Sequence, residues 1–315
     1  MYYNNPDFAY SASLRLNLRV VENPDIQRIQ QMLDGEGYVA DPTIATAVYL
    51  AISLHKPLLI EGPAGVGKTE IAKAMAHALH TQLIRLQCYE GIDANMALYE
   101  WNYQRQLLHI KLEEHGEKSI EQKEAAIFSE PFLLKRPLLQ ALRSNQSPVL
   151  LIDEIDRSDE AFESFLLEVL SDWQITIPEI GTLTATHIPY VITTSNRIRE
   201  LSDALRRRCL YLWIDYPSFE KELSIVRRKV QGIDEHLAVQ ITSFVQAIRH
   251  RKLARLPGIA ETLDWAASLV ALHRTHLDAA IIEETSGVLF KSREDTLKVK
   301  TELLPGLLQS IENAP

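Results

Sequence analysis

Cysteine is nearly absent from this sequence, since Cys88 and Cys209 are the only two in 315 residues. They lie far apart and outside any C-x-x-C spacing, so no disulfide framework or zinc site is predicted and both are expected to be reduced thiols. The sequence also lacks an apolar run of the roughly 18 residues that a membrane-spanning helix needs. Its first residues do not combine a basic start, an apolar middle and a small-residue cleavage site, so we expect a cytoplasmic protein without membrane insertion.

An excess of positive charge is missing as well, because 33 Lys and Arg oppose 42 Asp and Glu, which gives a net charge of −9. Binding along DNA or across an anionic membrane rests on clustered Lys and Arg, so only a local basic patch is left for such contacts and nucleic acid is not the expected partner. Hydrophobic residues form 46% of the chain. That share can bury a large core in one big domain or two smaller ones.

Short apolar segments alternate with helical patterns up to residue 216. Five segments are predicted to be strands: 57–61, 83–88, 149–152, 190–194 and 210–214. Four segments are predicted to be helices: 25–35, 42–53, 69–80 and 160–173. Asp41 and Pro42 form a helix cap followed by proline at the first helical position. The alternation predicts an α/β fold whose parallel five-stranded sheet is covered on both faces.

The strand pattern stops at Tyr216–Pro217, where the X-Pro pair disfavours a helix. Beyond this point helical periodicity takes over. One predicted helix face consists of Leu237, Ile241, Phe244, Val245 and Ile248. We therefore predict three parts: an N-terminal arm at residues 1–24, an α/β domain at 25–216 and a small helical domain at 217–315.

Residues 62–69 read Gly-Pro-Ala-Gly-Val-Gly-Lys-Thr and fit the pattern G-x-x-x-x-G-K-[ST] between a predicted strand and a predicted helix. Glycines let the backbone N–H groups and the helix N-terminus surround phosphates. Lys68 is predicted to reach the β- and γ-phosphates of ATP, and the Thr69 hydroxyl to bind Mg²⁺. The alternative is a glycine-rich turn without a ligand. The candidate nucleotide-binding residues are Gly62, Pro63, Ala64, Gly65, Val66, Gly67, Lys68 and Thr69, with Tyr38 and Val39 upstream.

A second motif follows the apolar strand at 149–152, which ends in Asp153 and Glu154. Open α/β sheets bind ligands at the carboxyl ends of their strands. Asp153 is therefore predicted to hold Mg²⁺, and Glu154 to orient and polarise the attacking water. Taken alone, an apolar run before Asp-Glu would mark only a strand end.

These two motifs, with Ile-Asp-Arg at 155–157 and Thr-Thr-Ser-Asn-Arg at 193–197, resemble the MoxR group of AAA+ ATPases from about residue 35 to the end of the helical domain. Segments 88–91, 98–102 and 259–265 are most similar to the accessory ATPases of carbon monoxide dehydrogenase maturation. The resemblance implies an AAA+ core with a helical lid. It also implies an ATP-driven chaperone that forms a homo-oligomeric ring, a hexamer. Its partner would carry a von Willebrand factor A domain, and its client would be a metal-cofactor enzyme.

The resemblance also assigns roles to single residues. Asn196 matches sensor 1, which holds the lytic water or the γ-phosphate beside Glu154; the alternative is a turn-forming asparagine. Arg208, in the run Arg206–Arg207–Arg208, matches an arginine finger that acts on ATP bound by a neighbouring subunit. Arg207 or a solvated basic face are the alternatives for this run. Arg157 either faces the neighbouring site or lies on the surface.

The sequence departs from the family pattern at sensor 2. Many MoxR relatives have an arginine at the start of a lid helix, where it touches the γ-phosphate, and Ala260 stands at that position here. Arg251 or Arg255 would have to substitute from a displaced position, or the lid would couple to the nucleotide without an arginine. The role is therefore left unassigned.

Two insertions are expected around the sheet. Lys68 and Asp153 are 85 positions apart, more than a βαβ crossover needs. Residues 93–111, with alternating aromatics, are predicted to form a hairpin that resembles the helix-2 insertion of the MoxR group. Residues 174–186 are predicted to form the hairpin before sensor 1. Both could contact a polypeptide or only pack on the sheet. The architecture of the family it resembles also makes Gln87, at the end of its strand, a candidate to hydrogen-bond Glu154 and to switch its orientation.

Two other functions share these motifs. A nucleic-acid-dependent motor or loader is the first, and the acidic balance counts against it. A nucleotide-gated scaffold with little turnover is the second.

Overall fold

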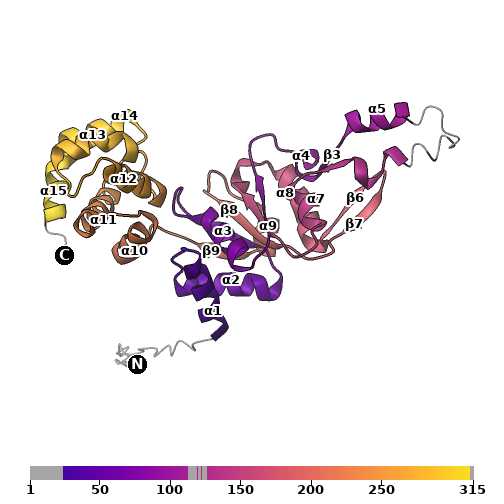
Figure 1. Cartoon of the computed structure of the whole chain (residues 1–315), viewed down its shortest axis with the longest axis horizontal. Coiled ribbons are helices and arrows are strands. Elements are labelled where there is room, and N and C mark those ends of the chain that lie inside the picture. Colours follow the sequence, from indigo (N-terminus) through magenta and orange to yellow (C-terminus); the bar gives the residue numbers. More distant parts are fainter. Residues whose placement is uncertain (1–23, 113–118, 120–121, 123–125, 313–315) are drawn as a thin grey trace, which may run out of the picture.

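The computed structural model describes residues 24–112, 119, 122 and 126–312. Residues 1–23, nearly all of the predicted N-terminal arm, lie outside the described residues. The rest forms an α/β part followed by a bundle of helices (Figure 1). No described helix combines the length and the apolar character that crossing a membrane requires.

A five-stranded sheet lies at the centre of the α/β part, in the order β2-β5-β8-β1-β9. The strands are β1 (Leu58–Glu61), β2 (Leu83–Gln87), β5 (Val149–Asp153), β8 (Tyr190–Ser195) and β9 (Leu210–Trp213). Every neighbouring pair is parallel, as predicted. Each residue of β1 and β5 is buried, because helices cover both faces of the sheet.

Separate helices cover the two faces. One face packs against α1 (Pro24–Gly35), α2 (Pro42–Leu54) and α3 (Lys68–Ala78), and the other against α7 (Pro137–Leu142), α8 (Glu160–Asp172) and α9 (Asp203–Arg208). Asp41 caps α2 as predicted, since its carboxylate accepts the N–H of Ile44 at 3.0 Å. The sheet is therefore a buried, hydrogen-bonded platform that presents its strand ends to the following loops.

The first predicted insertion has a different structure. After α4 (Ala94–Leu98), strand β3 (Tyr99–Trp101) pairs antiparallel with the distant β4 (Leu133–Lys135), not within 93–111. Residues after Asn102 form α5 (Tyr103–Leu112). The hairpin prediction for 93–111 was thus wrong. Only three aromatic residues alternate in this segment, and β3 pairs with a strand that follows α5 in the chain. A 3₁₀ turn, η1 (Glu130–Phe132), precedes β4.

The second insertion is the predicted hairpin. Strands β6 (Gln174–Ile177) and β7 (Gly181–Thr184) pair antiparallel. Ile175 and Ile177 point into the core that contains α8, while Thr176 and Thr182 stay exposed. The hairpin is thereby anchored by one face and leaves the other to solvent.

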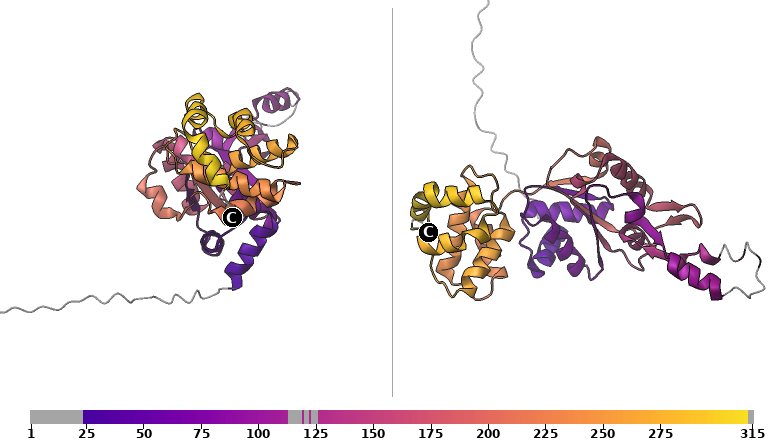
Figure 2. Two further views of the ribbon diagram at one scale, coloured as in Figure 1. Left: turned by 90° about the vertical axis from the view of Figure 1, so that its left-hand side faces the viewer. Right: turned by 90° about the horizontal axis from the view of Figure 1, so that it is seen from above.

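The C-terminal helices have a core of their own. They are α10 (Phe219–Lys229), α11 (Glu235–Arg249), α12 (Ile259–Ala271), α13 (Ala279–Leu289), α14 (Arg293–Lys298), a π-helical turn η3 (Val299–Leu303) and α15 (Leu304–Glu312). The predicted apolar face of α11 is fully buried in this core. Figure 2 shows the bundle at one end of the α/β part and α5 projecting from the other.

A buried ion pair holds the bundle together where it meets the α/β part. Arg249 of α11 lies 2.6 Å from Glu222 of α10, and both side chains are buried. The Thr262 hydroxyl of α12 also donates to Glu222, at 3.0 Å, and Tyr216 lies beneath the Arg249 guanidinium. The pair therefore fixes three helices to one another close to the joint at residue 217.

Candidate nucleotide-binding and hydrolysis site

The loop at residues 62–67 joins β1 to α3 in a conformation that requires glycine. A Cβ atom on Gly62 would lie 2.0 Å from the carbonyl oxygen of Ile214, so no larger residue fits. Gly67, the residue before α3, has a φ of 92° in the left-handed region, which glycine adopts without strain. The backbone therefore curls around the N-terminus of α3, where N–H groups and the helix dipole favour an anion.

Lys68 lies buried at the centre of this loop. Its ammonium donates to the carbonyl oxygens of Gly62 at 2.8 Å and Pro63 at 2.7 Å, and to Oδ1 of Asn196 at 2.7 Å. Burial lowers the pKa of Lys68 to about 8, and the nearby carboxylates of Asp156 and Asp153 oppose the shift. The ammonium is thus held in place by three acceptors of the protein itself.

Asp153, at the end of β5, is buried and fully engaged. Its Oδ1 accepts the hydroxyls of Thr69 at 3.1 Å and Thr194 at 2.6 Å. Its Oδ2 accepts Arg85 through Nε at 3.0 Å and Nη2 at 2.5 Å. Thr69 and Asp153 lie together as predicted, and hydroxyl and carboxylate oxygens are the donors that Mg²⁺ prefers. These residues therefore fit a magnesium ion.

Glu154 follows with a φ of 56°, an uncommon conformation for a residue other than glycine. Its carboxylate accepts Nε2 of Gln87 at 3.0 Å and Nδ2 of Asn196 at 3.3 Å. Arg157 of the same chain lies 2.8 Å away. The hydrogen bond predicted between Gln87 and Glu154 is confirmed. The left-handed turn directs the Glu154 side chain toward Asn196, so both polar groups face the same space as Lys68.

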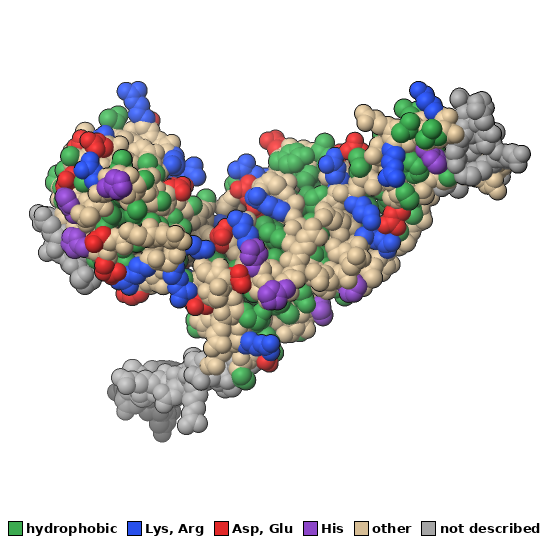
Figure 3. Space-filling model, in the orientation of Figure 1, with side chains coloured by type: hydrophobic (Ala, Val, Ile, Leu, Met, Phe, Trp, Pro, Cys, Tyr) green, Lys and Arg blue, Asp and Glu red, His purple; other side chains and the backbone are tan. Residues whose placement is uncertain are grey.

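Two adjoining cavities lie above these groups, where the helical bundle meets the α/β part. The first, about 430 Å³, is lined by the 64–70 loop, Asp153, Glu154, Asn196 and the start of α12. The second, about 360 Å³, is lined by Tyr38, Val39 and several apolar side chains. Figure 3 shows the groove between the two parts of the molecule. An elongated ligand with a charged end and a flat apolar end matches this pair of cavities.

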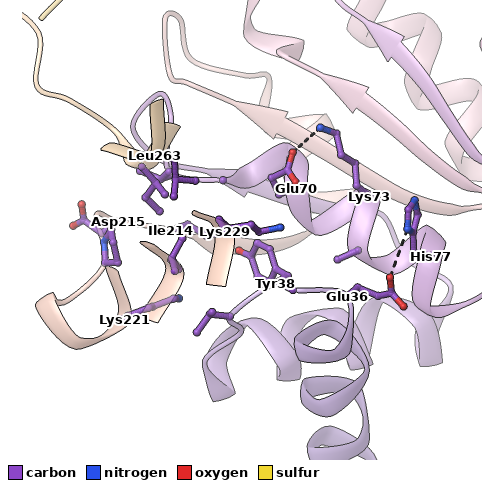
Figure 4. Close-up of a pocket in the computed structure, with 18 residues that line it drawn as sticks. Glu36, Tyr38, Glu70, Lys73, His77, Ile214, Asp215, Lys221, Lys229 and Leu263 are labelled. Carbon is purple, nitrogen blue, oxygen red and sulfur yellow. Dashed lines mark hydrogen bonds and ion pairs between the residues drawn. The ribbon is translucent and has the colours of Figure 1, made fainter. Parts of the chain in front are cut away.

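The second cavity contains the two upstream residues of the candidate set (Figure 4). Tyr38 is partly exposed and its pKa is raised by burial. Its ring lies near Gly67, since a Cβ atom there would stand 3.9 Å from the Tyr38 Cε2. Ile214 and Leu263 form the opposite wall, so the cavity is walled by both parts of the molecule.

Helix α12 contacts the loop at residues 62–67 directly. The N–H groups of Ile259 and Ala260 donate to the carbonyl oxygen of Gly65 at 2.8 Å and 3.3 Å. A Cβ atom on Gly258 would stand only 2.8 Å from the Cα of Gly65. The backbone at the start of α12 therefore packs directly on the backbone of the loop at 62–67, with no side chain between them.

Of the arginines considered from the family pattern, Arg157 pairs with Glu154 of its own chain, and the others line neither cavity. Arg208 is exposed at the end of α9 and lines neither cavity. Ala260 lines the first cavity, whereas Arg251 and Arg255 line neither. Arg255 lies 3.9 Å from Glu261 instead. Within the described residues, no arginine lines either cavity, and α12 contributes Ile259, Ala260, Leu263 and Asp264 to the lining of the first.

Sequence reasoning missed Arg85 and Thr194, both of which contact Asp153. Arg85 stands two positions before Gln87, on the same face of the strand, and this spacing was the available signal. Thr194 stands two positions before Asn196, within the segment 193–197. Both residues come close to Asp153 only because β2 and β8 flank β5 in the sheet. No local sequence pattern predicts this strand order.

Residues 58–213 match the family described as "ATPase family associated with various cellular activities (AAA)". An uncharacterized protein of Staphylococcus haemolyticus is 24% identical over 225 residues, which cover 69% of this chain and 78% of that protein. Lon protease of Syntrophus aciditrophicus is 27% identical over 69% of this chain but only 26% of the protease. Chaperone protein ClpB of Chlamydia muridarum is 27% identical over 60% of this chain and 22% of its own length.

Among solved structures, the RuvB Holliday junction branch migration motor of Thermotoga maritima is 20% identical, with a TM-score of 0.43. The similarity covers 90% of this chain and 82% of that one.

Proposed function

We propose that ATP binds in the two cavities beside α12 and that this chain, whose residues 58–213 match the AAA ATPase family, hydrolyses it to ADP and phosphate. The triphosphate lies in the first cavity, where the 62–69 loop and Lys68 meet its negative charge. The adenine lies between Tyr38, Val39 and the apolar wall of the second cavity. The position of Lys68, which lines the first cavity together with Asp153 and Glu154, carries this proposal.

Thr69 and Asp153 are the residues that hold Mg²⁺. The ion would neutralise negative charge on the phosphate oxygens. Thr194 contributes by keeping the Asp153 carboxylate fixed through Oδ1. The oxygen-only donor set supports this assignment.

Glu154 and Asn196 act on the attacking water. Glu154 is placed to accept a proton from water as the bond to phosphorus forms. Asn196 contacts both Glu154 and Lys68, at 3.3 Å and 2.7 Å, so its amide fixes the distance between the base and the phosphate-binding amine. Such positioning is how phosphoryl transfer is accelerated, because the reaction needs little covalent help from the protein.

Arg208 completes the site of another copy of the chain. Its exposure at the end of α9, away from both cavities of its own subunit, supports action in trans. The active form is then a homo-oligomeric ring, for which we propose six subunits. Hydrolysis takes place between subunits, with one supplying the cavities and the next supplying the arginine.

The work done by this ring is the remodelling or maturation of a partner protein. The similarity to the ClpB chaperone and the two insertions that project from the sheet support this function. A MoxR-type assignment, close to the accessory ATPases of carbon monoxide dehydrogenase maturation, makes a protein with a von Willebrand factor A domain the partner and a metal-cofactor enzyme the client.

The roles of Lys68 and Glu154 are separable by experiment. Lys68→Ala should lose both binding of a fluorescent ATP analogue and phosphate release. Glu154→Gln should keep binding and lose hydrolysis by roughly 10²–10⁴-fold, the range of a general base. Lys56→Ala and Glu160→Gln, on exposed residues outside both cavities, are matched controls expected to behave as wild type.

Unchanged hydrolysis in Glu154→Gln would show that this carboxylate is not the base. The same variant, which retains ATP, is the form to use for capture of partners from the source cell, with Lys68→Ala as the comparison. Recovery of a von Willebrand factor A protein only with Glu154→Gln would support the chaperone proposal. Stimulation of hydrolysis by DNA that falls steeply with salt would instead favour a nucleic-acid motor.

A further inference from the structure

Asp156 is a buried carboxylate that the proposed mechanism does not use. It lies in the 3₁₀ turn η2 (Ile155–Arg157), directly after the residue that follows β5. Only 2% of Asp156 is exposed, and a charge at such a depth is strongly destabilising unless its oxygens accept hydrogen bonds. The partners of this carboxylate therefore indicate its role.

Those partners are backbone N–H groups of the loop that follows β8. Oδ2 of Asp156 accepts the N–H of Asn196 at 3.0 Å and the N–H of Ile198 at 2.8 Å. Oδ1 has no hydrogen-bond partner within the part of the chain that the structure describes. A single carboxylate oxygen therefore holds both N–H groups of this loop.

The backbone of the loop is bent around this oxygen. Arg197, between the two donors, has a φ of 59° in the left-handed region, where residues other than glycine are uncommon. Backbone N–H groups beside a left-handed residue can converge on one anion, as they do in concave turns that bind phosphate. The N–H of Arg197 itself donates to Oγ of Ser195 at 3.0 Å. The bonds to Asp156 thus stabilise a backbone conformation that is otherwise unfavourable.

Asn196, whose backbone is held in this way, places its amide between two groups of the proposed site. Its Oδ1 accepts the ammonium of Lys68 at 2.7 Å, and its Nδ2 donates to Oε1 of Glu154 at 3.3 Å. Both ends of the amide are engaged. A displacement of the backbone at 196 therefore changes the distance to Lys68, to Glu154 or to both.

A further contact joins the segments after β5 and at the end of β8. The N–H of Glu154 donates to the Thr194 hydroxyl at 2.9 Å, whereas Asp156 accepts from the loop after β8. The two strands are adjacent and parallel, so backbone hydrogen bonds fix the strands and these side-chain contacts fix the segments beyond them.

We propose that Asp156 is a positioning residue for ATP hydrolysis, which holds the loop at 196–198 so that the Asn196 amide stays between Lys68 and Glu154. Asp156 lines neither cavity, so it acts on the reaction only through Asn196. This inference rests on the proposed function, because it takes Asn196 and Glu154 in the roles given above.

The test measures steady-state phosphate release and binding of a fluorescent ATP analogue by the full chain. Asp156→Ala leaves two N–H groups without their acceptor. It should lower kcat about 100-fold, the loss that a displacement of about 1 Å causes in a preorganised site. Affinity for the analogue should change less than about threefold, because the lost interaction is one made in the transition state. Asp156→Asn keeps an oxygen that can accept both N–H groups and should keep kcat within about threefold of wild type.

Asp295→Ala is the matched control. Asp295 is 4% exposed and accepts the backbone N–H groups of Ala254 at 2.9 Å and Arg255 at 3.1 Å, within the helical bundle. Its removal should lower the melting temperature about as much as Asp156→Ala does, while kcat stays close to wild type. If Asp156→Ala likewise loses stability but keeps kcat, its role is only structural and the inference is wrong.

Action through Asn196 is tested by a double-mutant cycle on kcat. In the Asn196→Ala background, Asp156→Ala should lower kcat no further, because the amide that it positions is already gone. Additive effects would overturn the inference. The same conclusion would follow if Asp156→Asn were as slow as Asp156→Ala, since the charge would then matter and not the acceptance of the two N–H groups.

Should Asp156→Ala fail to fold, Asp156→Glu serves instead. It keeps the charge but moves the acceptor by one methylene, so it should lower kcat by a smaller factor with unchanged affinity for the analogue. Wild-type kcat in Asp156→Glu would contradict the inference.

Asn196→Ala separates this inference from the proposed function. Wild-type kcat in that variant would overturn the role of Asn196 itself, and with it this part of the proposed function. A loss of kcat in Asn196→Ala without any loss in Asp156→Ala would overturn only the positioning by Asp156.

Discussion

Glu154 is the one position in the site where a non-glycine residue with a left-handed backbone also carries a proposed catalytic group. Its φ of 56° costs about 1 to 3 kcal/mol for a residue of this kind. The N–H of Glu154 is held by the Thr194 hydroxyl at 2.9 Å, and its carboxylate by Gln87 and Asn196. These contacts, together with the ion pair to Arg157, keep the turn in place and fix the direction of the side chain.

The two thiols are predicted to be inert in the native protein. Burial raises the pKa of both Cys88 and Cys209 to about 12 from an ordinary value of 9.0. For Cys88 the carboxylates of Asp153, Asp156 and Glu154 add to the shift. A raised pKa leaves less thiolate at pH 8, roughly a thousandfold less over three units. Reaction with a chromogenic disulfide at pH 8 should therefore be slow in native protein and fast in guanidinium.

Release of either thiol within seconds under native conditions would contradict this expectation. Labelling near pH 7 and pH 9 gives a further check, since the native rate should rise steadily with pH and show no plateau near pH 9.

At the residue scale the sequence predicted that the loop at 62–67 joins a strand to a helix and that Asp153 ends a strand, because each belongs to a local pattern with a fixed spacing. The roles of these residues and of Glu154 stay predictions. Arg85 could not be found in the same way. Its contact with Asp153 joins positions 68 apart in the chain, and the order of strands alone brings them together. The roles assigned to Asn196 and Arg208 stay predictions, although Asn196 does lie between Lys68 and Glu154.

The start of α12 packs tightly against the loop at residues 62–67. Gly258 is packed against Gly65 so closely that an added Cβ would meet Gly65 Cα at 2.8 Å and Ala64 O at 2.9 Å. Gly258 itself has a φ of −85°, which alanine adopts freely. Any effect of Gly258→Ala is therefore steric, arising from the forced separation of α12 from the phosphate-binding loop.

Gly258→Ala is expected to lower the free energy of unfolding by about 1 to 3 kcal/mol, as overpacking does, and to weaken ATP binding. Thermal unfolding and titration with a fluorescent ATP analogue measure the two effects. Gly287→Ala, inside α13 where an added Cβ meets nothing within 4 Å, is the control. It should raise stability by up to about 1 kcal/mol, because alanine favours helix. If Gly258→Ala has the stability and ATP affinity of wild type, the contact between Gly258 and Gly65 adapts to an added methyl group without cost.

The strands of the central sheet were predictable because buried parallel strands are short apolar runs bounded by turns. The pairing of β3 could not be predicted, and the hairpin expected at 93–111 is absent. Strand β3 has only three residues, and its partner β4 lies beyond α5. Three alternating aromatics cannot specify a partner strand. Trp101 is buried against Phe128 instead, a contact between residues far apart in the sequence that local alternation does not reveal.

At the scale of the whole molecule, the chain has separate cores. The core of the helical bundle contains buried residues from Leu223 to Leu307 and none from the sheet. The cavities lie where the two parts meet and take walls from both. A nucleotide in these cavities therefore contacts both parts at once, which makes its binding sensitive to how they are set relative to each other.

Action in trans predicts complementation between inactive variants. Arg208→Ala keeps its own cavities and Glu154, whereas Glu154→Gln keeps Arg208. Each should be inactive alone, while an equimolar mixture should recover activity, since about one quarter of interfaces formed by random pairing combine an intact base with an intact arginine. Phosphate release from mixtures of varied ratio measures this recovery.

Arg206→Ala in place of Arg208→Ala is the control for the basic run, because Arg206 stacks on Tyr211 of its own chain and should leave activity nearly unchanged. If Arg208→Ala and Glu154→Gln assemble together without any recovered activity, Arg208 does not act on a neighbouring subunit.

The strand order β2-β5-β8-β1-β9 sets the dimensions within which turnover takes place. Strand β8 lies between the strand that leads into the phosphate-binding loop and the strand that ends in Asp153, so these are two strand spacings apart, about 10 Å. That interval is fixed by two ladders of backbone hydrogen bonds and cannot change without breaking them. The sheet therefore holds a fixed distance between the two sides of the proposed triphosphate site. Movements during ATP hydrolysis are confined to the loops, the side chains and the helical bundle.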